Sequence, residues 1–312
     1  MATLASPNYA LLTSEWESSA TCAPREGAAQ TVHFTADDGR LLTGSLYQPR
    51  TRPKAGILIA GATGVPRGFY NRYAAWLAAQ GYIVLSFDYR GVGDSRLHSM
   101  RADHARMRDW GQLDLPAAVD CLDEQIGELP ILMIGHSVGG QMLGVMRNHK
   151  RISACAMIAT GIGYWGGMPR RFGWFTLAMW YGFEPLTGWL MGYAPNSRIG
   201  CGEDLPRGVA RDWRNWCLRA DYFSELRDDN PPADFDGVQC PILSLHFPDD
   251  PIATNANVDG LLRFYPNASV EKRLLQPADY GQRQIGHLHF FASRMPEALW
   301  RQPLDWLEAQ LT

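Results

Sequence analysis

One short glycine-bearing turn constrains this chain more than any other feature. The run Gly135-His136-Ser137-Val138-Gly139 follows an apolar stretch, residues 130–134, and precedes residues 138–148, which have a helical pattern. A strand that passes into a helix through so few residues must turn sharply, and it needs glycine where side chains would collide. Such a turn exposes the side chain at its apex. Ser137 lies at that apex and is the first candidate for a reactive group.

Further apolar runs predict a mainly parallel sheet. Each is short, continuous and bounded by turn residues, as in strands that are covered on both faces. These runs are residues 55–60, 82–87, 130–134, 152–158 and 241–247, with a last strand at 270–275. The helical patterns between and after them are residues 68–80, 106–126, 138–148, 255–264 and 293–310. Strands that alternate with helices predict an α/β fold with helices on both faces of the sheet.

The first strands follow a different pattern. Residues 31–36 and 41–47 alternate between apolar and polar side chains, and Asp37-Asp38-Gly39-Arg40 between them is typical of a hairpin turn. We therefore expect the sheet to open with antiparallel strands.

The length of 312 residues suits one domain with a sizeable insertion. We predict a loosely ordered segment at residues 1–30 and a core formed by residues 31–160 and 239–312. Residues 161–238 separate two strands that one helix would otherwise join, so we interpret them as an inserted helical cap. This insertion is rich in tryptophan: Trp165, Trp174, Trp180, Trp189, Trp213 and Trp216.

Composition excludes several classes of protein. The net charge of −3 comes without any block of like charge, so no nucleic-acid partner is predicted. The N-terminus does not resemble a signal peptide and the six cysteines are scattered, which together favour a cytoplasmic protein.

Residues 172–193 are apolar apart from Glu184, but Glu184-Pro185 and several glycines interrupt them. We therefore predict short helices over the site there and no transmembrane span.

No cofactor or metal is predicted. One segment matches the glycine spacing of the dinucleotide-binding fingerprint GxGxxG: Gly161-Ile162-Gly163-Tyr164-Trp165-Gly166. Its aromatic side chains, however, lie where a phosphate would approach. The cysteines form no CxxC pair, and no third ligand cluster accompanies His287 and His289. The sequence does not indicate an oligomeric state.

A serine nucleophile needs a base, a group that orients the base, and donors for the developing oxyanion. Asp249-Asp250 follows the strand at 241–247, and we choose Asp250 as the orienting acid with Asp249 as the alternative. His287 follows Gly286 in a late loop and is preferred as the base over His289, which we expect to pack near the site. The order Ser, Asp, His along the chain fits the strand–turn–helix context of Ser137.

Backbone amides are the expected oxyanion donors. One is the amide of Val138, directly after the nucleophile. The other is expected in the loop Gly61-Ala62-Thr63-Gly64, from either Ala62 or Thr63.

These motifs resemble those of the α/β-hydrolase superfamily, in particular the serine-aminopeptidase-like branch of bacterial serine hydrolases. The resemblance covers about residues 31–311. The matching segments are Gly61-Ala62-Thr63-Gly64, residues 87–95 (FDYRGVGDS), residues 135–140 (GHSVGG), residues 249–252 (DDPI) and residues 286–291 (GHLHFF). One departure is the oxyanion loop, where Ala60 replaces the usual histidine before glycine. The resemblance implies an α/β-hydrolase fold with a Ser137, Asp250, His287 triad, and it implies that Arg90 and Asp94 hold their loop by hydrogen bonds.

The expected reaction is cleavage of an acyl bond through an acyl-enzyme on Ser137. The tryptophan-rich cap favours a small-molecule acyl substrate with an apolar portion, and a carboxylic ester is the leading class. The same groups could also serve an acyltransferase, a thioesterase or an amidase. A non-catalytic ligand-binding protein of the same fold is the alternative from a different class.

Overall fold

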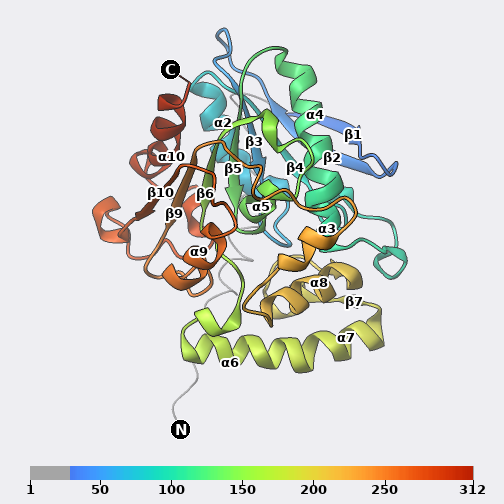
Figure 1. Ribbon diagram of the computed structural model, residues 1–312. Coiled ribbons are helices and arrows are strands. Elements are labelled where there is room, and N and C mark those ends of the chain that lie inside the picture. Colours follow the sequence, from blue (N-terminus) through green and yellow to red (C-terminus); the bar gives the residue numbers. More distant parts are fainter. Residues whose placement is uncertain (1–28, 312) are drawn as a thin grey trace.

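A single mixed sheet of eight strands organises the chain (Figure 1). The computed structural model describes residues 29–311. The strands run in the order β1-β2-β4-β3-β5-β6-β9-β10. Their bounds are β1 (Gln30–Thr35), β2 (Leu41–Tyr47), β3 (Gly56–Ala60), β4 (Ile83–Asp88), β5 (Ile131–His136), β6 (Ile152–Ile158), β9 (Ile242–His246) and β10 (Val270–Leu274). Strand β2 is antiparallel to β1 and β4, and every other pairing is parallel. The predicted fold class is therefore confirmed.

Helices cover both faces of the sheet, as expected for parallel strands with crossover connections. The main ones in the core are α2 (Asn71–Ala79), α3 (Met107–Asp109), α4 (Leu115–Ile126), α5 (Val138–Gln141), α9 (Asn255–Leu262) and α10 (Glu297–Ala309). Between α3 and α4 the chain continues through a π-helical turn, η4 (Trp110–Asp114).

Alternate residues of each central strand supply two separate cores, because successive side chains point to opposite faces. In β3, Leu58 packs with one cluster, whereas Ile57 and Ile59 pack with the other. The first cluster contains the buried face of α4, and the second contains the buried faces of α2 and α10. All five residues of β3 are buried, so the carboxyl edge of the sheet has a rigid support.

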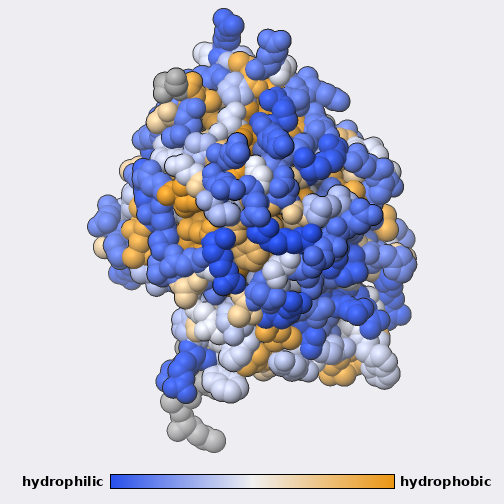
Figure 2. Space-filling model, in the orientation of Figure 1, coloured by the Kyte–Doolittle hydropathy of each residue, from blue (hydrophilic) through white to orange (hydrophobic). Residues whose placement is uncertain are grey.

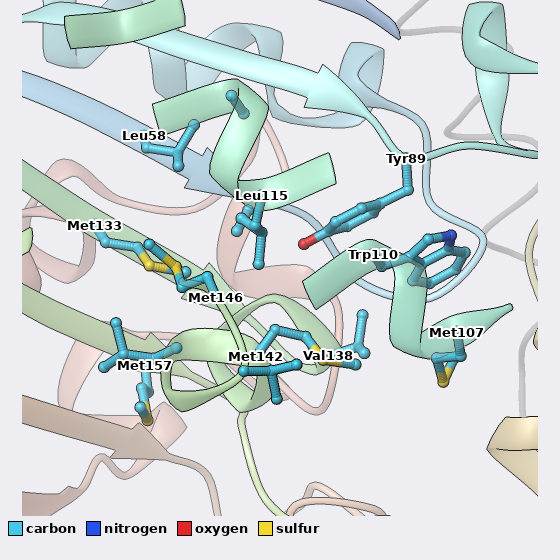
Figure 3. Close-up of a cluster of buried hydrophobic side chains, with 14 of the residues drawn as sticks. Leu58, Tyr89, Met107, Trp110, Leu115, Met133, Val138, Met142, Met146 and Met157 are labelled. Atoms are coloured by element: carbon cyan, nitrogen blue, oxygen red, sulfur yellow. The ribbon is translucent and has the colours of Figure 1, made fainter. Parts of the chain in front are cut away.

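The first core packs directly under the turn that carries Ser137 (Figure 3). Val138 and Met142, just after that turn, lie in the same cluster as the rings of Tyr89 and Trp110. Those two rings are stacked with centroids 4.7 Å apart. Packing on this side therefore holds the start of α5 in place.

Two helices differ from the sequence prediction. The helix predicted at 138–148 is α-helical only to Gln141 and continues as a 3₁₀ turn, η5 (Met142–Gly144). A Cβ at Gly144 would collide with Phe235, so the chain passes close to a distant segment there. The helix predicted at 293–310 begins only at Glu297, after Pro296 at its N-cap. Proline is favoured before and at the first turn of a helix and disfavoured within it, which explains the later start.

The segment between β6 and β9 forms a separate group of helices beyond the carboxyl edge of the sheet (Figure 1). It contains α6 (Arg170–Ala178), the π-helical turn η8 (Met179–Phe183), α7 (Glu184–Met191) and α8 (Arg207–Cys217), with the strand pair β7 (Tyr193–Ala194) and β8 (Leu205–Pro206). Within residues 29–311 we find no helix with the length and hydropathy needed to cross a bilayer. The boundaries of the cap at 161 and 238 remain a prediction. Most of the segment predicted at 1–30 lies outside the described residues.

Candidate active site

Ser137 lies between β5 and α5 in a strained backbone conformation, with φ 51° and ψ −118°. Few non-glycine residues adopt a positive φ, so the surrounding packing must enforce it. The flanking glycines allow this packing: a Cβ at Gly135 would collide with Gly140, and one at Gly139 would collide with the carbonyl of Ala60. The glycine spacing read from the sequence thus has a steric cause.

His287 joins Ser137 to Asp250. Its Nε2 is 3.0 Å from the Ser137 hydroxyl, and its Nδ1 is 2.8 Å from Oδ2 of Asp250. Asp250 is buried, and its other oxygen accepts hydrogen bonds from the amides of Ile252 and Ala253 at 2.8 and 3.0 Å. The carboxylate can only accept, so Nδ1 carries the proton and Nε2 is left to accept from the Ser137 hydroxyl. These are the positions that a base and its orienting acid require.

Asp249 holds a different part of the same region. Its Oδ2 accepts hydrogen bonds from the backbone amides of Ile285 and Gly286, at 2.9 and 3.0 Å. Asp250 therefore contacts the imidazole, while its neighbour fixes the loop that carries the imidazole. His289 lies in the short turn η12 (His289–Phe291), and it is His287 that reaches Ser137.

A buried hydrogen-bond chain connects the oxyanion loop to the histidine loop. The amide of Ala62 donates to the Tyr70 hydroxyl, 2.8 Å away, and that hydroxyl lies 2.8 Å from Nδ1 of His136. Nε2 of His136 is 2.8 Å from the carbonyl oxygen of His287. This row of hydrogen bonds was not predicted from the sequence, because Tyr70 belongs to no recognised motif. A buried tyrosine after a glycine-rich loop is the only signal that could have indicated it.

The direction of each bond follows from the protonation state of His136. Burial, and to a smaller extent the nearby His287, lowers the pKa of His136 to about 3, so its ring is neutral near pH 7. The carbonyl of His287 can only accept, so Nε2 of His136 donates to it and Nδ1 accepts from the Tyr70 hydroxyl. The Ala62 amide is thus already engaged, whereas we find no acceptor for the amides of Val138 and Thr63 within residues 29–311.

We expect Tyr70→Phe to destabilise the protein by about 1–3 kcal/mol, because it leaves the Ala62 amide and Nδ1 of His136 buried without partners. Urea denaturation would measure the loss. Tyr73→Phe is the matched control: Tyr73 is also fully buried, but its hydroxyl has no hydrogen-bond partner among the described residues. We expect that variant to change stability by less than about 1 kcal/mol. Equal losses in the two variants would contradict the bridging role of Tyr70.

A cavity of about 390 Å³ opens above Ser137 and His287. Its wall on the far side comes from α6, η8 and Met168 just before α6, and it is largely apolar: Met168, Phe172, Phe175, Met179 and Trp180. Ala62, Thr63 and Leu288 line it near Ser137, and Arg96, Ser197, Glu203 and Asp204 give it a polar region. A cleft of this size with few polar groups suits a small amphipathic molecule.

Ion pairs hold the loop after β4 beside this cavity. The guanidinium of Arg90 donates to Asp114 at 2.7 Å and to Asp38 at 2.7 Å. Arg67 donates to Asp94 at 2.7 Å and also pairs with the buried Asp88. The hydrogen bonds expected of Arg90 and Asp94 are therefore present.

The chain is similar to known hydrolases in both sequence and fold. Residues 57–302 match a family model described as the Alpha/beta hydrolase family. Among curated proteins, the monoglyceride lipase of Homo sapiens is 30% identical over 110 residues, and that of Mus musculus is 28% identical over 108 residues. Each match covers 35% of this chain and 35% of the relative, so the chain spans about a third of the length of these relatives.

Solved structures match over most of the chain. An esterase from Pyrococcus furiosus aligns with a TM-score of 0.59 at 18% identity, covering 92% of this chain and 94% of that one. A soluble variant of monoglyceride lipase from Saccharomyces cerevisiae, in complex with a substrate analog, aligns with a TM-score of 0.63 at 16% identity, covering 93% and 99%. At these identities the likeness is one of fold.

Proposed function

The chain belongs to the α/β-hydrolase family, and we propose that it is a serine hydrolase that cleaves carboxylic esters with an apolar acyl portion. The observation that carries this proposal is the row of hydrogen bonds from Ser137 through His287 to the buried Asp250. A hydroxyl at the apex of a strained turn, in hydrogen-bond contact with an imidazole that a buried carboxylate orients, has the arrangement that nucleophilic catalysis needs.

In the proposed mechanism, the Ser137 oxygen attacks the ester carbonyl while Nε2 of His287 takes its proton. Asp250 orients the ring and stabilises the imidazolium. His287 then gives the proton to the departing alkoxide, and the alcohol leaves an acyl group on Ser137. Water, deprotonated by His287, attacks this ester, and His287 then returns the proton to the Ser137 oxygen as the acid leaves.

The oxyanion of each tetrahedral intermediate needs two backbone donors. We assign these to the amides of Val138 and Thr63. The amide of Ala62 is the less suitable of the two expected loop donors, because it already donates to Tyr70.

The apolar wall of the cavity supports an apolar acyl portion, and its polar region near Arg96 and Glu203 suits a small polar alcohol. Similarity to monoglyceride lipases, whose name describes an ester of this kind, supports the same class of substrate. A small-molecule ester is therefore the proposed partner, and a cytoplasmic location remains a prediction.

A fluorophosphonate probe would test the nucleophile directly. We expect it to label wild-type protein at Ser137, as located by mass spectrometry, and to leave a folded Ser137→Ala variant unlabelled. Absence of labelling in folded wild-type protein would instead favour a ligand-binding protein that keeps the fold. A series of esters with acyl chains of increasing length would then define the substrate, with kcat/KM expected to rise as the chain fills the cavity.

A further inference from the structure

The helices between β6 and β9 include a rod, formed by α6, η8 and α7 (residues 170–191), that presents large apolar side chains to solvent. Within residues 29–311, ten large hydrophobic side chains are exposed, and six of them belong to this rod. These six, with their exposed fractions, are Trp174 (66%), Phe175 (46%), Tyr181 (65%), Leu186 (57%), Trp189 (75%) and Leu190 (57%). So large a share on one element marks an interaction surface, because monomeric proteins rarely leave such a patch uncovered.

On the side of the rod that faces solvent, the exposed apolar side chains form a stripe that contains no charged group. Trp174, Tyr181 and Trp189 follow one another at intervals of seven and eight residues, which places them on one side of a helix. From Phe172 to Tyr193 the only ionisable side chain besides tyrosine is Glu184, and it is buried with Oε2 3.7 Å from Nε of Arg214. Figure 2 shows a pale and orange band at the end of the molecule where Figure 1 places α6 and α7.

Positive charge lies at both ends of this stripe. Arg170 and Arg171 are exposed at its first turn. Near its other end, Arg207, Arg211 and Arg214 of α8 line a shallow hollow against α7, and among residues 29–311 Glu184 is the only acid that lines it. Three guanidinium groups against one carboxylate leave two positive charges uncompensated there.

We propose that this rod docks on a lipid bilayer that contains anionic phospholipid. Tryptophan and tyrosine favour the level of the headgroups, where an apolar ring meets a polar boundary. Arginines beside such a stripe attract anionic headgroups, and the fork of donors on a guanidinium matches a phosphate. A second copy of the chain fits less well: because both ends of the rod are positive, either antiparallel or parallel pairing of two rods would bring like charges together.

The opposite side of the same rod faces the cavity. Phe172, Thr176, Met179 and Trp180 line that cavity above Ser137, and Phe175 lines it too at the border with the exposed side. Docking would therefore place the wall of the cavity against the lipid, next to a source of apolar esters. This last consequence rests on the proposed function, whereas the docking surface does not.

Sedimentation with vesicles tests the surface. We expect wild-type protein to bind vesicles of phosphatidylcholine with phosphatidylglycerol about tenfold more tightly than vesicles of phosphatidylcholine alone. The double variant Trp174→Ser, Trp189→Ser should bind both at least about tenfold more weakly. A double variant Leu41→Ser, Leu274→Ser is the matched control, because it removes two exposed apolar side chains from the sheet and should bind as wild type does.

A second pair of variants tests whether the arginines cause the preference for anionic lipid. Arg207→Gln with Arg211→Gln should weaken the preference for phosphatidylglycerol, because only Arg170 and Arg171 then remain, whereas Arg52→Gln, at an exposed position in the loop before β3, should keep it in full. Equal binding of wild type to the two kinds of vesicle would overturn the role of the arginines. Failure of wild type to bind either kind, or a wild-type dimer that the tryptophan variant dissociates in analytical ultracentrifugation, would overturn the docking proposal.

Different results would contradict the docking surface and the proposed function. Trp174 and Trp189 do not line the cavity, so their variants should hydrolyse a water-soluble short-chain ester at the wild-type rate. Ser137→Ala should bind vesicles as wild type does, because Ser137 lies inside the cavity. Vesicle binding without hydrolysis would contradict the proposed function alone, and hydrolysis without binding would contradict the docking surface alone.

Discussion

Ser137→Ala is expected to lower kcat for ester hydrolysis by about 10⁴- to 10⁶-fold. The variant lacks the oxygen that we propose attacks the carbonyl, and it keeps His287, Asp250 and the proposed oxyanion donors. A small residual rate would come from the binding site and these donors. Steady-state kinetics with a chromogenic ester would measure it, and circular dichroism would show that the variant is folded.

Ser244→Ala provides the control for this substitution. Ser244 is a buried serine of β9, outside the cavity, whose hydroxyl has no hydrogen-bond partner within residues 29–311. Its loss should leave kcat unchanged. A folded Ser137→Ala variant that kept a tenth of the wild-type kcat would show that Ser137 is not the nucleophile, and that His287 instead activates water.

Asp250→Asn should lower kcat by about 10⁴-fold with a much smaller change in KM. The asparagine amide can donate to Nδ1 of His287, and it would then favour the tautomer with its proton on Nε2. That tautomer cannot accept the Ser137 proton. The same steady-state assay would measure the change, and labelling by a fluorophosphonate should slow in parallel.

The neighbouring carboxylate provides a sharp comparison. Asp249→Asn weakens two hydrogen bonds to the amides of Ile285 and Gly286, and it does not touch the imidazole. We expect it to cost about 1–3 kcal/mol of stability and to change kcat by less than about tenfold. If the Asp249 variant lost activity and the Asp250 variant kept it, the two assignments would have to be exchanged.

Much of the fold could be predicted from local patterns. The apolar runs at 55–60, 152–158 and 241–247 became β3, β6 and β9 within one residue at each end, because strands covered on both faces need apolar side chains throughout. The antiparallel start was also predictable, since residues 31–36 and 41–47 alternate around a turn of Asp and Gly.

Features that depend on distant contacts could not be predicted. The helix after Ser137 passes into a 3₁₀ turn that ends at Gly144, which lies against Phe235, a residue about ninety positions further along the chain. The sequence left Ala62 and Thr63 open as oxyanion donors, because the side chain that engages Ala62 belongs to Tyr70, at the end of a loop with no motif. The serine-aminopeptidase-like branch and the three-part division of the chain remain predictions.

The two adjacent aspartates have a mechanical consequence. The turn at 249–250 bonds to the imidazole of His287 through one carboxylate and to the two preceding backbone amides through the other. Asp250 and His287 therefore lie on segments that cannot separate unless these bonds break together. Local opening here would be a cooperative event, in which the loop leaves the sheet as one unit or stays in place. The surrounding loops can therefore move without changing the distance between His287 and Asp250.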